Sequence, residues 1–276
     1  MKETYINPGT KKIIDSMCRR LPQSLLLFGE PGVGLSVVGN YITNYYQIKP
    51  TIILPEKDEV IDLEKGIISV DIMRRLYGET KTIASKKRII IVDYAERMTH
   101  QAQNAFLKLL EEPGQNTHFI LLSHSTANIL PTIMSRVEKV NIKPISANQS
   151  NELLDKLGVG DKTKRAQLLY IASGLPAELT RLSSDEKYFE SRVIIVRDAR
   201  EILSGKPYQK LLVIQRYKDN RASALTLLTD MAHILRLSVS SGQSYETINK
   251  IDKILTVYQQ IESNCNIRLC LAQLIE

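Results

Sequence analysis

The stretch RIIIVDYAERMTHQAQNAFLKLLEEPGQNTHFILLSHSTANILPTIMSR, residues 88–136, decides the fold of this 276-residue chain. Residues 89–92 form a short apolar run, mostly β-branched, that is typical of a strand buried on both faces of a parallel sheet. The run ends at Asp93, so a carboxylate is expected at the carboxyl end of this strand.

A helix and a second strand are predicted to follow the first strand. Thr99 is a favoured residue at the start of a helix, and the pair Pro113-Gly114 would end it. Apolar residues recur between these limits at helical spacing: Ala102, Phe106, Leu109 and Leu110. Residues 118–122 are again apolar, so they are expected to form the next strand.

The carboxyl ends of these two strands are the predicted site. In an open α/β sheet a ligand binds outside the carboxyl ends of the strands, so Asp93 and Ser123 should face one crevice. The Asp93 carboxylate could hold Mg²⁺ through a water molecule. Glu96 lies beyond the strand end by a further two residues and is expected to point elsewhere.

A glycine-rich loop precedes this stretch. Residues 24–28 form an apolar strand, and GEPGVGLS at 29–36 follows it with Walker A spacing, so backbone N–H groups could curl around phosphates. The positions that would surround the nucleotide are Gly29, Gly32, Gly34, Leu35 and Ser36. Leu35 stands where the motif has lysine, and losing one such charged group costs about 3–4 kcal/mol of transition-state stabilisation.

Four segments of this chain resemble the core of bacterial DNA polymerase III clamp-loader subunits, which are AAA+ proteins that open sliding clamps. They are DYA at 93–95, Met98, QNAFLKLLEEP at 103–113 and LPTIMSRV at 130–137. The resemblance implies an α/β AAA+ P-loop base domain, with a parallel sheet between helices, followed by an all-α lid and an all-α collar domain.

The resemblance also implies roles for single positions. The family has a glutamate after the strand-end aspartate, where it polarises water, but this chain has Tyr94 at that position. Tyrosine has an ordinary pKa of about 10 and is a poor base at pH 7. The alternative is that Tyr94 is a packing residue. Ser123 or His124 would sense the γ phosphate, or either is an ordinary polar residue at a strand end. Ala177 replaces the lid arginine, and Arg181, one turn further on, is more typical of a solvated surface.

Composition limits the cellular context and the partners. The net charge of +7 and the pI near 9.2 favour acidic partners such as nucleic acid, although dispersed basic residues equally fit a solvated surface. Three cysteines, with no CxxC pair and none between Cys18 and Cys265, fit a reducing cytosol and predict no zinc module and no metal site. No signal peptide or membrane span is recognisable, so a cytoplasmic protein without a membrane partner is expected.

The chain after Pro144 is predicted to be helical. Ser146 with Gln149 forms a capping-box pattern, and Pro176 is a favoured first residue of a helix. Two apolar stripes are expected to be buried in a final helical bundle: Leu225, Leu228, Ala232, Leu235 and Val239, and then Ile248, Ile251, Leu255 and Tyr258. The predicted domains are the base 1–142, the lid 143–184 and the collar 185–276, which would carry oligomerisation.

Within the family the chain most resembles the delta-prime subunits, which keep the fold but lack a working nucleotide site. This predicts a non-catalytic subunit with no cofactor of its own and with ATP and Mg²⁺ bound at the neighbouring subunit.

Ser135 and Arg136 keep the family's Ser-Arg motif, although Val137 replaces its cysteine. The resemblance places Arg136 so that it acts in trans as an arginine finger. The implied partners are other clamp-loader subunits (gamma/tau and delta), the sliding clamp and primer-template DNA. The alternative to the trans role is local: Arg136 either pairs with Glu138 or caps carbonyls at the end of the short helix that begins at Pro131.

Two alternatives remain open from the sequence. The chain could be an ATP-hydrolysing gamma-type subunit that borrows Lys86 or Lys87 for the missing charge. It could also be a non-replicative AAA+ scaffold that binds nucleic acid or another protein. Turnover by the pure protein would favour the first alternative, and a failure to co-purify with a clamp or with loader subunits would favour the second.

Overall fold

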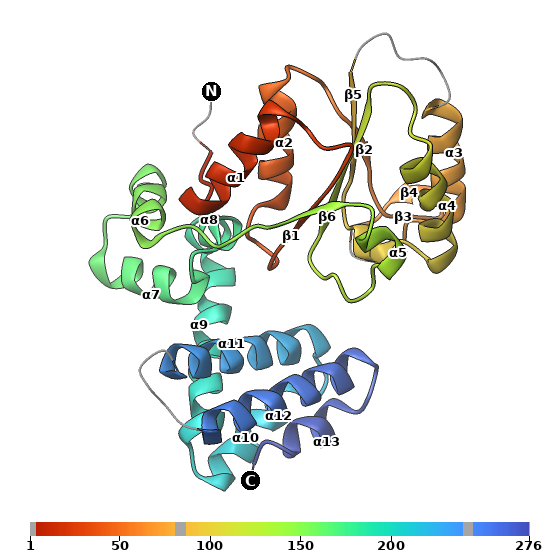
Figure 1. Cartoon of the computed structure of the whole chain (residues 1–276). Coiled ribbons are helices and arrows are strands. Elements are labelled where there is room, and N and C mark those ends of the chain that lie inside the picture. Colours follow the sequence, from red (N-terminus) through yellow and green to blue (C-terminus); the bar gives the residue numbers. More distant parts are fainter. Residues whose placement is uncertain (1–3, 64, 81–86, 240–244, 276) are drawn as a thin grey trace. The chain divides into compact units, whose positions relative to one another are not determined.

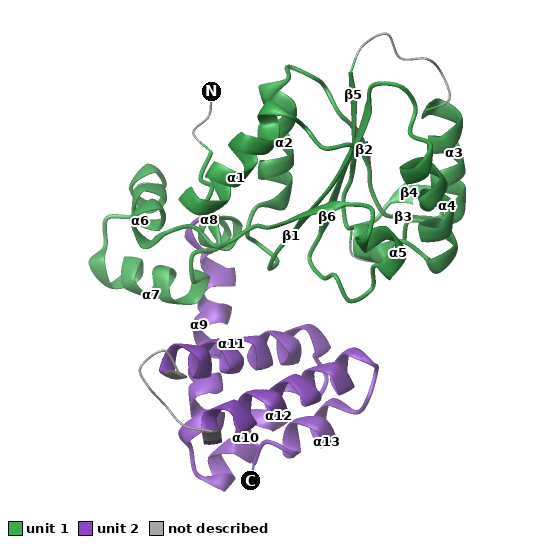
Figure 2. Cartoon of the chain, in the orientation of Figure 1, with its two compact units in different colours: residues 1–181 green, residues 182–276 purple. Residues whose placement is uncertain are grey.

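The computed structural model describes residues 4–63, 65–80, 87–239 and 245–275, which fold into two compact units (Figure 2). The first unit comprises Met1–Arg181 and the second Leu182–Glu276. The first unit holds every predicted site residue.

A five-stranded parallel sheet forms the centre of the first unit. Its strands are β1 (Ser24–Phe28), β2 (Thr51–Ile53), β5 (Arg88–Val92), β6 (Thr117–Ser123) and β7 (Glu138–Asn141), in the order β2-β5-β6-β1-β7. Phe28 lies opposite Ser123, and Leu121 lies opposite Val92, so the carboxyl ends of the three central strands share one edge. The buried apolar runs of β1, β5 and β6 explain why a parallel sheet forms here.

Helices cover both faces of the sheet (Figure 1). On one face lie α1 (Pro8–Arg19) and α2 (Leu35–Tyr45), and on the other lie α3 (Val70–Thr80), α4 (His100–Glu111) and the short α5 (Pro131–Met134). Thr99 caps α4 through a hydrogen bond from the Ala102 N–H, as predicted. Each face therefore has its own apolar core, which confirms the predicted α/β base.

Two small elements were not predicted. A hairpin of β3 (Glu56–Lys57) and β4 (Val60–Ile61) precedes α3, and the 3₁₀ turn η1 (Ala95–Arg97) follows β5. The hairpin strands are only two residues long, so no alternating pattern marks them in the sequence. Helix α2 begins at Leu35, directly after Gly34, which takes a left-handed conformation at its N-cap.

Three helices complete the first unit: α6 (Ala147–Lys156), α7 (Lys162–Ala172) and α8 (Pro176–Ser184), the last of which crosses the boundary at Arg181. Ser146 and Gln149 form the predicted capping box of α6. These helices fall in one unit with the sheet, so the division into a base and a lid at residue 142 stays a prediction.

The second unit is a helical bundle with its own core. It consists of α9 (Glu186–Ser204), α10 (Pro207–Tyr217), α11 (Arg221–Val239), α12 (Tyr245–Glu262) and α13 (Ile267–Ala272). Leu228 and Ala232 are buried as predicted, and Leu225 and Leu235 pack against the same core, while the side chain of Val239 lies outside the described residues. The stripe predicted on α12 is only partly right, because Tyr258 packs against the core but two other members do not. Ile248 and Leu255 are exposed, whereas Ile254, Val257 and Ile261 are buried. Both sets have helical spacing, so periodicity alone could not tell them apart.

Candidate functional site

The loop between β1 and α2 keeps the shape of a phosphate-binding loop. Gly32 and Gly34 have φ values of 88° and 92°, which L side chains rarely adopt. A Cβ atom on Gly29 would lie 2.7 Å from the Ile142 carbonyl oxygen, so only glycine fits there without a shift. Ser36 is exposed in the first turn of α2. The backbone requirement of the motif is therefore retained.

Leu35 occupies the lysine position of the loop but does not face solvent. Its side chain is 3% exposed and belongs to the core beneath α1 and α2, together with Val33 and Val38. An apolar side chain is stable in this place, and it provides no charge for a phosphate group. The leucine is therefore part of the packing of the base.

The start of α8 lies directly against this loop. The Ala177 N–H donates a hydrogen bond to the Gly32 carbonyl oxygen at 3.1 Å. A Cβ on Gly32 would lie 3.6 Å from the Leu175 Cβ, and a Cβ on Gly34 would lie 3.8 Å from the Pro176 Cγ. The helix that would carry the lid arginine thus packs on the loop through backbone and apolar atoms.

Asp93 and Tyr94 follow β5 in a tight turn. Tyr94 has a left-handed backbone with φ of 55°, and its N–H donates to Asp93 Oδ1 at 2.9 Å. The tyrosine ring makes an edge contact with His124, with ring centroids 5.6 Å apart, and the Arg97 guanidinium lies 4.8 Å from the ring centroid. Tyr94 is therefore a packing residue between the His124 ring and the Arg97 guanidinium.

The buried Ser123 and the half-buried Glu96 form a polar pair beside Asp93. The Ser123 hydroxyl is fully buried and lies 2.8 Å from Glu96 Oε2 and 2.6 Å from the Ser125 carbonyl oxygen. The expectation that Glu96 points elsewhere is wrong, because the left-handed Tyr94 and the turn of η1 bring it back towards β6. No sequence pattern identifies such a turn, so the direction of the Glu96 side chain could not be predicted.

The charges at this edge of the sheet influence one another. Burial raises the pKa of Asp93, and Glu96 raises it further, whereas the Tyr94 N–H and His124 lower it. His124 Nδ1 also lies 3.4 Å from the Gly29 carbonyl oxygen, which links this group to the glycine loop. Asp93, Ser123 and the glycine loop therefore meet at one edge, and Glu96 and His124 join them.

Arg136 and Ser135 lie elsewhere in the unit. Arg136 Nη1 donates to the Thr132 carbonyl oxygen at 3.0 Å, and Nη2 donates to Glu111 Oε1 at 2.9 Å. The Ser135 hydroxyl donates to the same Thr132 oxygen at 3.0 Å. The guanidinium remains partly exposed, because the side chain of Arg136 is 41% exposed.

The position of Arg136 follows from the sheet register. Arg136 precedes β7, whose first residue Glu138 lies opposite Leu25 of β1 in a parallel pair. Glu111 ends α4, shortly before the chain enters β6 at Thr117. Arg136 therefore lies towards the amino ends of the strands, whereas the glycine loop follows the carboxyl end of β1.

Comparison with known proteins gives these features a family context. The sequence family described as DNA polymerase III, delta subunit, matches residues 52–146. DNA polymerase III subunit delta' of Bacillus subtilis is 31% identical over 116 residues, which are 42% of this chain and 34% of that protein. The subunit delta' of Pseudomonas aeruginosa is 33% identical over 141 residues, which are 49% of this chain and 42% of that protein.

The chain is thus similar to clamp-loader subunits of the delta' type. Human replication factor C subunit 5 is also similar, with 31% identity over 134 residues, which are 46% of this chain and 37% of that protein. The chain thus spans between 34% and 42% of the length of these relatives. The residues that match the family model, 52–146, include Asp93, Glu96 and Ser123 of the candidate site.

Solved structures agree on the fold. A DNA polymerase III gamma subunit-related protein from Thermotoga maritima superposes with a TM-score of 0.52 and 19% identity, covering 96% of this chain and 97% of that one. A point mutant of RuvB from the same organism gives a TM-score of 0.51 and 13% identity, covering 64% of this chain and 61% of that one. The predicted AAA+ fold class is confirmed by these neighbours.

Of the two lysines suggested as replacements for the missing one, only Lys87 lies in the described residues, and it is placed away from the glycine loop. Lys87 Nζ lies 4.1 Å from the ring centroid of Tyr46, at the end of α2 remote from the glycine loop, and Lys86 lies outside the described residues. Within the described parts of the chain, no three His, Cys, Asp or Glu side chains are grouped to hold a metal ion. In those same parts, no helix is long and apolar enough to cross a membrane.

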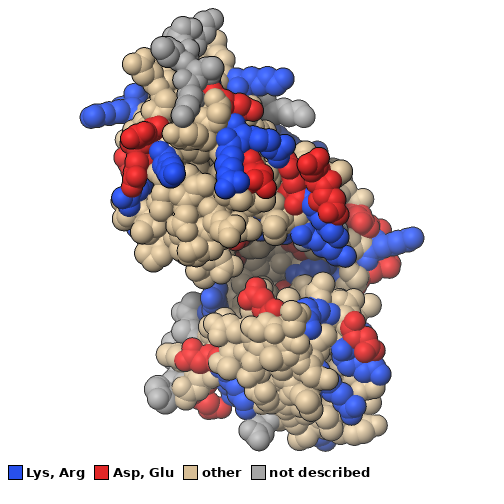
Figure 3. Space-filling view, turned by 90° about the vertical axis from the view of Figure 1, so that its right-hand side faces the viewer, with Lys and Arg blue, Asp and Glu red and all other residues tan. Residues whose placement is uncertain are grey.

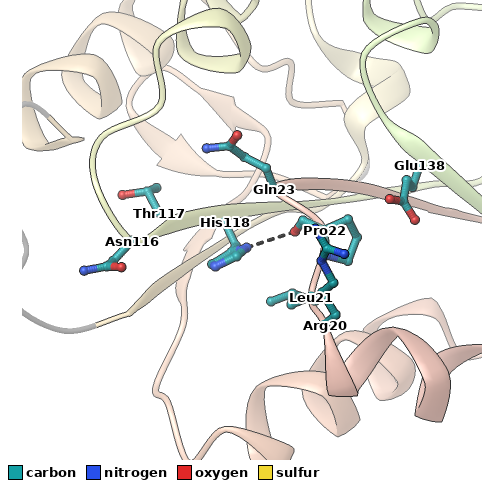
Figure 4. Close-up of a pocket in the computed structure, with 8 residues that line it drawn as sticks. All are labelled: Arg20, Leu21, Pro22, Gln23, Asn116, Thr117, His118 and Glu138. Carbon is teal, nitrogen blue, oxygen red and sulfur yellow. Dashed lines mark hydrogen bonds between the residues drawn. The ribbon is translucent and has the colours of Figure 1, made fainter.

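A pocket of about 700 Å³ opens at the other edge of the sheet (Figure 4). It lies at the amino ends of β1, β6 and β7, and polar side chains line most of it: Arg20, Gln23, Asn116, Thr117, His118 and Glu138. Figure 4 shows the His118 ring directed at the Pro22 carbonyl oxygen, which lies 2.9 Å from Nδ1. None of the predicted site residues lines this pocket.

Proposed function

We propose that the protein is a non-catalytic, delta'-like subunit of a DNA polymerase III clamp loader. In this role it supports ATP-dependent loading of a sliding clamp onto primed DNA during replication. Its partners are other clamp-loader subunits of the gamma/tau and delta types, and ATP and Mg²⁺ are bound by a neighbouring subunit. The observation that carries the proposal is the burial of Leu35 at the lysine position of the glycine loop.

The site at the carboxyl edge supports a subunit without turnover of its own. Leu35 is buried, Tyr94 is engaged in packing, and the backbone of Ala177 is bonded to the loop that would hold phosphates. Restoring one charge would leave the other two changes in place. Loss of each such group costs on the order of 3–4 kcal/mol of transition-state stabilisation.

Arg136 is the residue proposed to act on ATP held by an adjacent subunit. It is partly exposed, and it lies at the opposite end of the sheet from its own glycine loop. A guanidinium that meets the charge developing on a transferred phosphoryl group raises the rate by roughly 10³ to 10⁵ in well-studied systems. Ser135 supports the turn by donating to the carbonyl that Arg136 also contacts.

The net charge of +7 fits a protein that works beside DNA in the cytoplasm. On the face in Figure 3, lysine and arginine side chains alternate with acidic ones and do not form one continuous basic field. DNA contact by this subunit is therefore proposed as part of the assembled loader, in which several subunits contribute charge.

The experiment is reconstitution of the loader with the Arg136→Ala variant. The variant should join the complex and remain folded, because the local contacts of Arg136 are exposed and worth at most about 1 kcal/mol. ATP hydrolysis stimulated by DNA and clamp should fall by at least about tenfold, and Arg136→Lys should rescue it only in part because lysine lacks the planar fork. Unchanged stimulated hydrolysis in a complex that contains the alanine variant would refute the trans role.

One observation favours a second function, an ATP-hydrolysing gamma-type subunit. Glu96 reaches Ser123 and lies close enough to Asp93 to affect its pKa, so a carboxylate is present near the position of the missing base. The buried Leu35 weighs against it, since the lysine position of the loop carries an apolar side chain without charge. Turnover of ATP by the isolated protein would decide for this function.

A further inference from the structure

We propose that Glu111 is a positioning residue that orients Arg136 for a neighbouring subunit's nucleotide. The inference rests on the trans role proposed for Arg136 and adds a second residue to it. Glu111 is the last residue of α4, and it lies 25 positions before Arg136 in the sequence. The two are brought together because α4 and the short helix α5 pack side by side on one face of the sheet.

Two contacts fix the plane of the Arg136 guanidinium. Nη2 donates to Glu111 Oε1 at 2.9 Å, and Nη1 donates to the Thr132 carbonyl oxygen at 3.0 Å. Because each terminal nitrogen has one anchor, the planar group cannot rotate about its long axis without losing a hydrogen bond. A guanidinium has five N–H donors, so three remain for a phosphoryl group after these contacts.

Both side chains of the Arg136–Glu111 ion pair are exposed, and this exposure limits what the pair contributes to stability. The side chains of Arg136 and Glu111 are 41% and 53% exposed, so the ion pair contributes little to folding. Its effect is instead to reduce the number of rotamers that the Arg136 side chain adopts before the neighbouring subunit binds. Ordering such a side chain during binding or catalysis carries an entropic cost that this contact removes in advance.

Glu112 provides a matched control for Glu111. It is the next residue, it is exposed, and it carries the same charge at the end of the same helix. Its side chain makes no ion pair with any part of the chain that the structure describes. A general effect of removing negative charge near Arg136 should therefore appear in both variants, whereas a positioning effect should appear only with Glu111.

The test uses the reconstituted complex with Glu111→Ala, Glu111→Gln and Glu112→Ala, each in the wild-type and Arg136→Ala backgrounds. Glu111→Ala should lower the stimulated kcat by about fivefold without changing KM for ATP, the size expected for an exposed ion pair. Glu111→Gln should retain part of the activity because its amide oxygen can still accept from Nη2. Glu112→Ala should have no effect, and Glu111→Ala should have none when Arg136 is already alanine.

The outcomes separate this inference from the proposed function. If Arg136→Ala leaves stimulated hydrolysis unchanged, the trans role fails, and the positioning role fails with it. If Arg136→Ala lowers the rate while Glu111→Ala does not, or while Glu111→Ala raises it, only the positioning role is overturned. An equal loss from Glu111→Ala in both backgrounds would likewise overturn it, because the effect would then not act through Arg136.

Discussion

Asp93 lies at the carboxyl end of β5 with its carboxyl group partly buried beside Glu96. Burial disfavours the charged form and raises its pKa above the ordinary value of 3.8. A carboxyl whose pKa is raised by folding destabilises the folded protein wherever it is ionised. In this protein that destabilisation is absent below pH 3.8 and fully present above the raised folded-state pKa.

Replacing Asp93 with asparagine is therefore predicted to stabilise the protein at pH 7. The amide oxygen of asparagine can still accept the Tyr94 N–H, so the turn should be kept. The gain in the free energy of unfolding should shrink as the pH falls from neutral to 3.8. Urea unfolding of both proteins at several pH values measures this difference. A gain that grew at lower pH, or a loss at pH 7, would contradict the raised pKa of the partly buried Asp93.

The residues differ in how well the sequence predicts them. The glycine loop and Asp93 could be placed, because an apolar strand ends next to each of them. Glu96 could not, since its direction depends on one left-handed residue, Tyr94, and tyrosine has no preference for that conformation. The sequence suggests Glu138 as a local partner of Arg136, but the partner is Glu111, whose place depends on how α4 and α5 pack.

Among the elements, α10 has an unusual distribution of apolar side chains. Its inner side is buried through Val213, Ile214 and Tyr217. Its outer side presents Tyr208, Leu211 and Leu212, which are 71%, 50% and 48% exposed. These three recur at steps of three and four residues, so they form one stripe along the helix. An exposed apolar stripe of this kind is typical of an interaction surface.

The α10 stripe gives the predicted oligomerisation of residues 185–276 a definite test. Leu211→Lys combined with Leu212→Lys should leave the fold intact, since both side chains are exposed, but should weaken assembly with the loader subunits at least about tenfold. Leu255→Lys on α12, where the leucine is 42% exposed, serves as the control. Co-elution of the double variant with its partners at micromolar concentration, unchanged from wild type, would be evidence against this stripe as the interface.

The sequence predicted long elements better than short or rotationally ambiguous ones. Helix α4 was predictable at both ends, because Thr99 caps it and Pro113 follows it. The β3–β4 hairpin was not, because strands of two residues carry no period. On α12, isoleucine and leucine occur on more than one face of the helix, so the predicted stripe included the exposed Ile248 and Leu255 beside the packed Tyr258.

At the scale of the whole molecule, the proposed function requires that the protein keeps an AAA+ fold while its own nucleotide site does not hydrolyse ATP. The confirmed fold cannot decide this, because RuvB and clamp-loader proteins share it. The changes at Leu35, Tyr94 and Ala177 are separate in sequence, yet they lie around one edge of the sheet. We therefore expect that a single reversion will not restore activity.

The most direct measurement is steady-state ATP hydrolysis by the purified protein alone, with Mg²⁺, for wild type, Leu35→Lys and Asp93→Ala. We predict no turnover above the Asp93→Ala background in either of the other two proteins. Leu35→Lys should remain inactive because Tyr94 still occupies the position of the base. Turnover of ATP by the wild-type protein that Asp93→Ala abolishes would contradict the proposed non-catalytic role and would make this chain an ATPase in its own right.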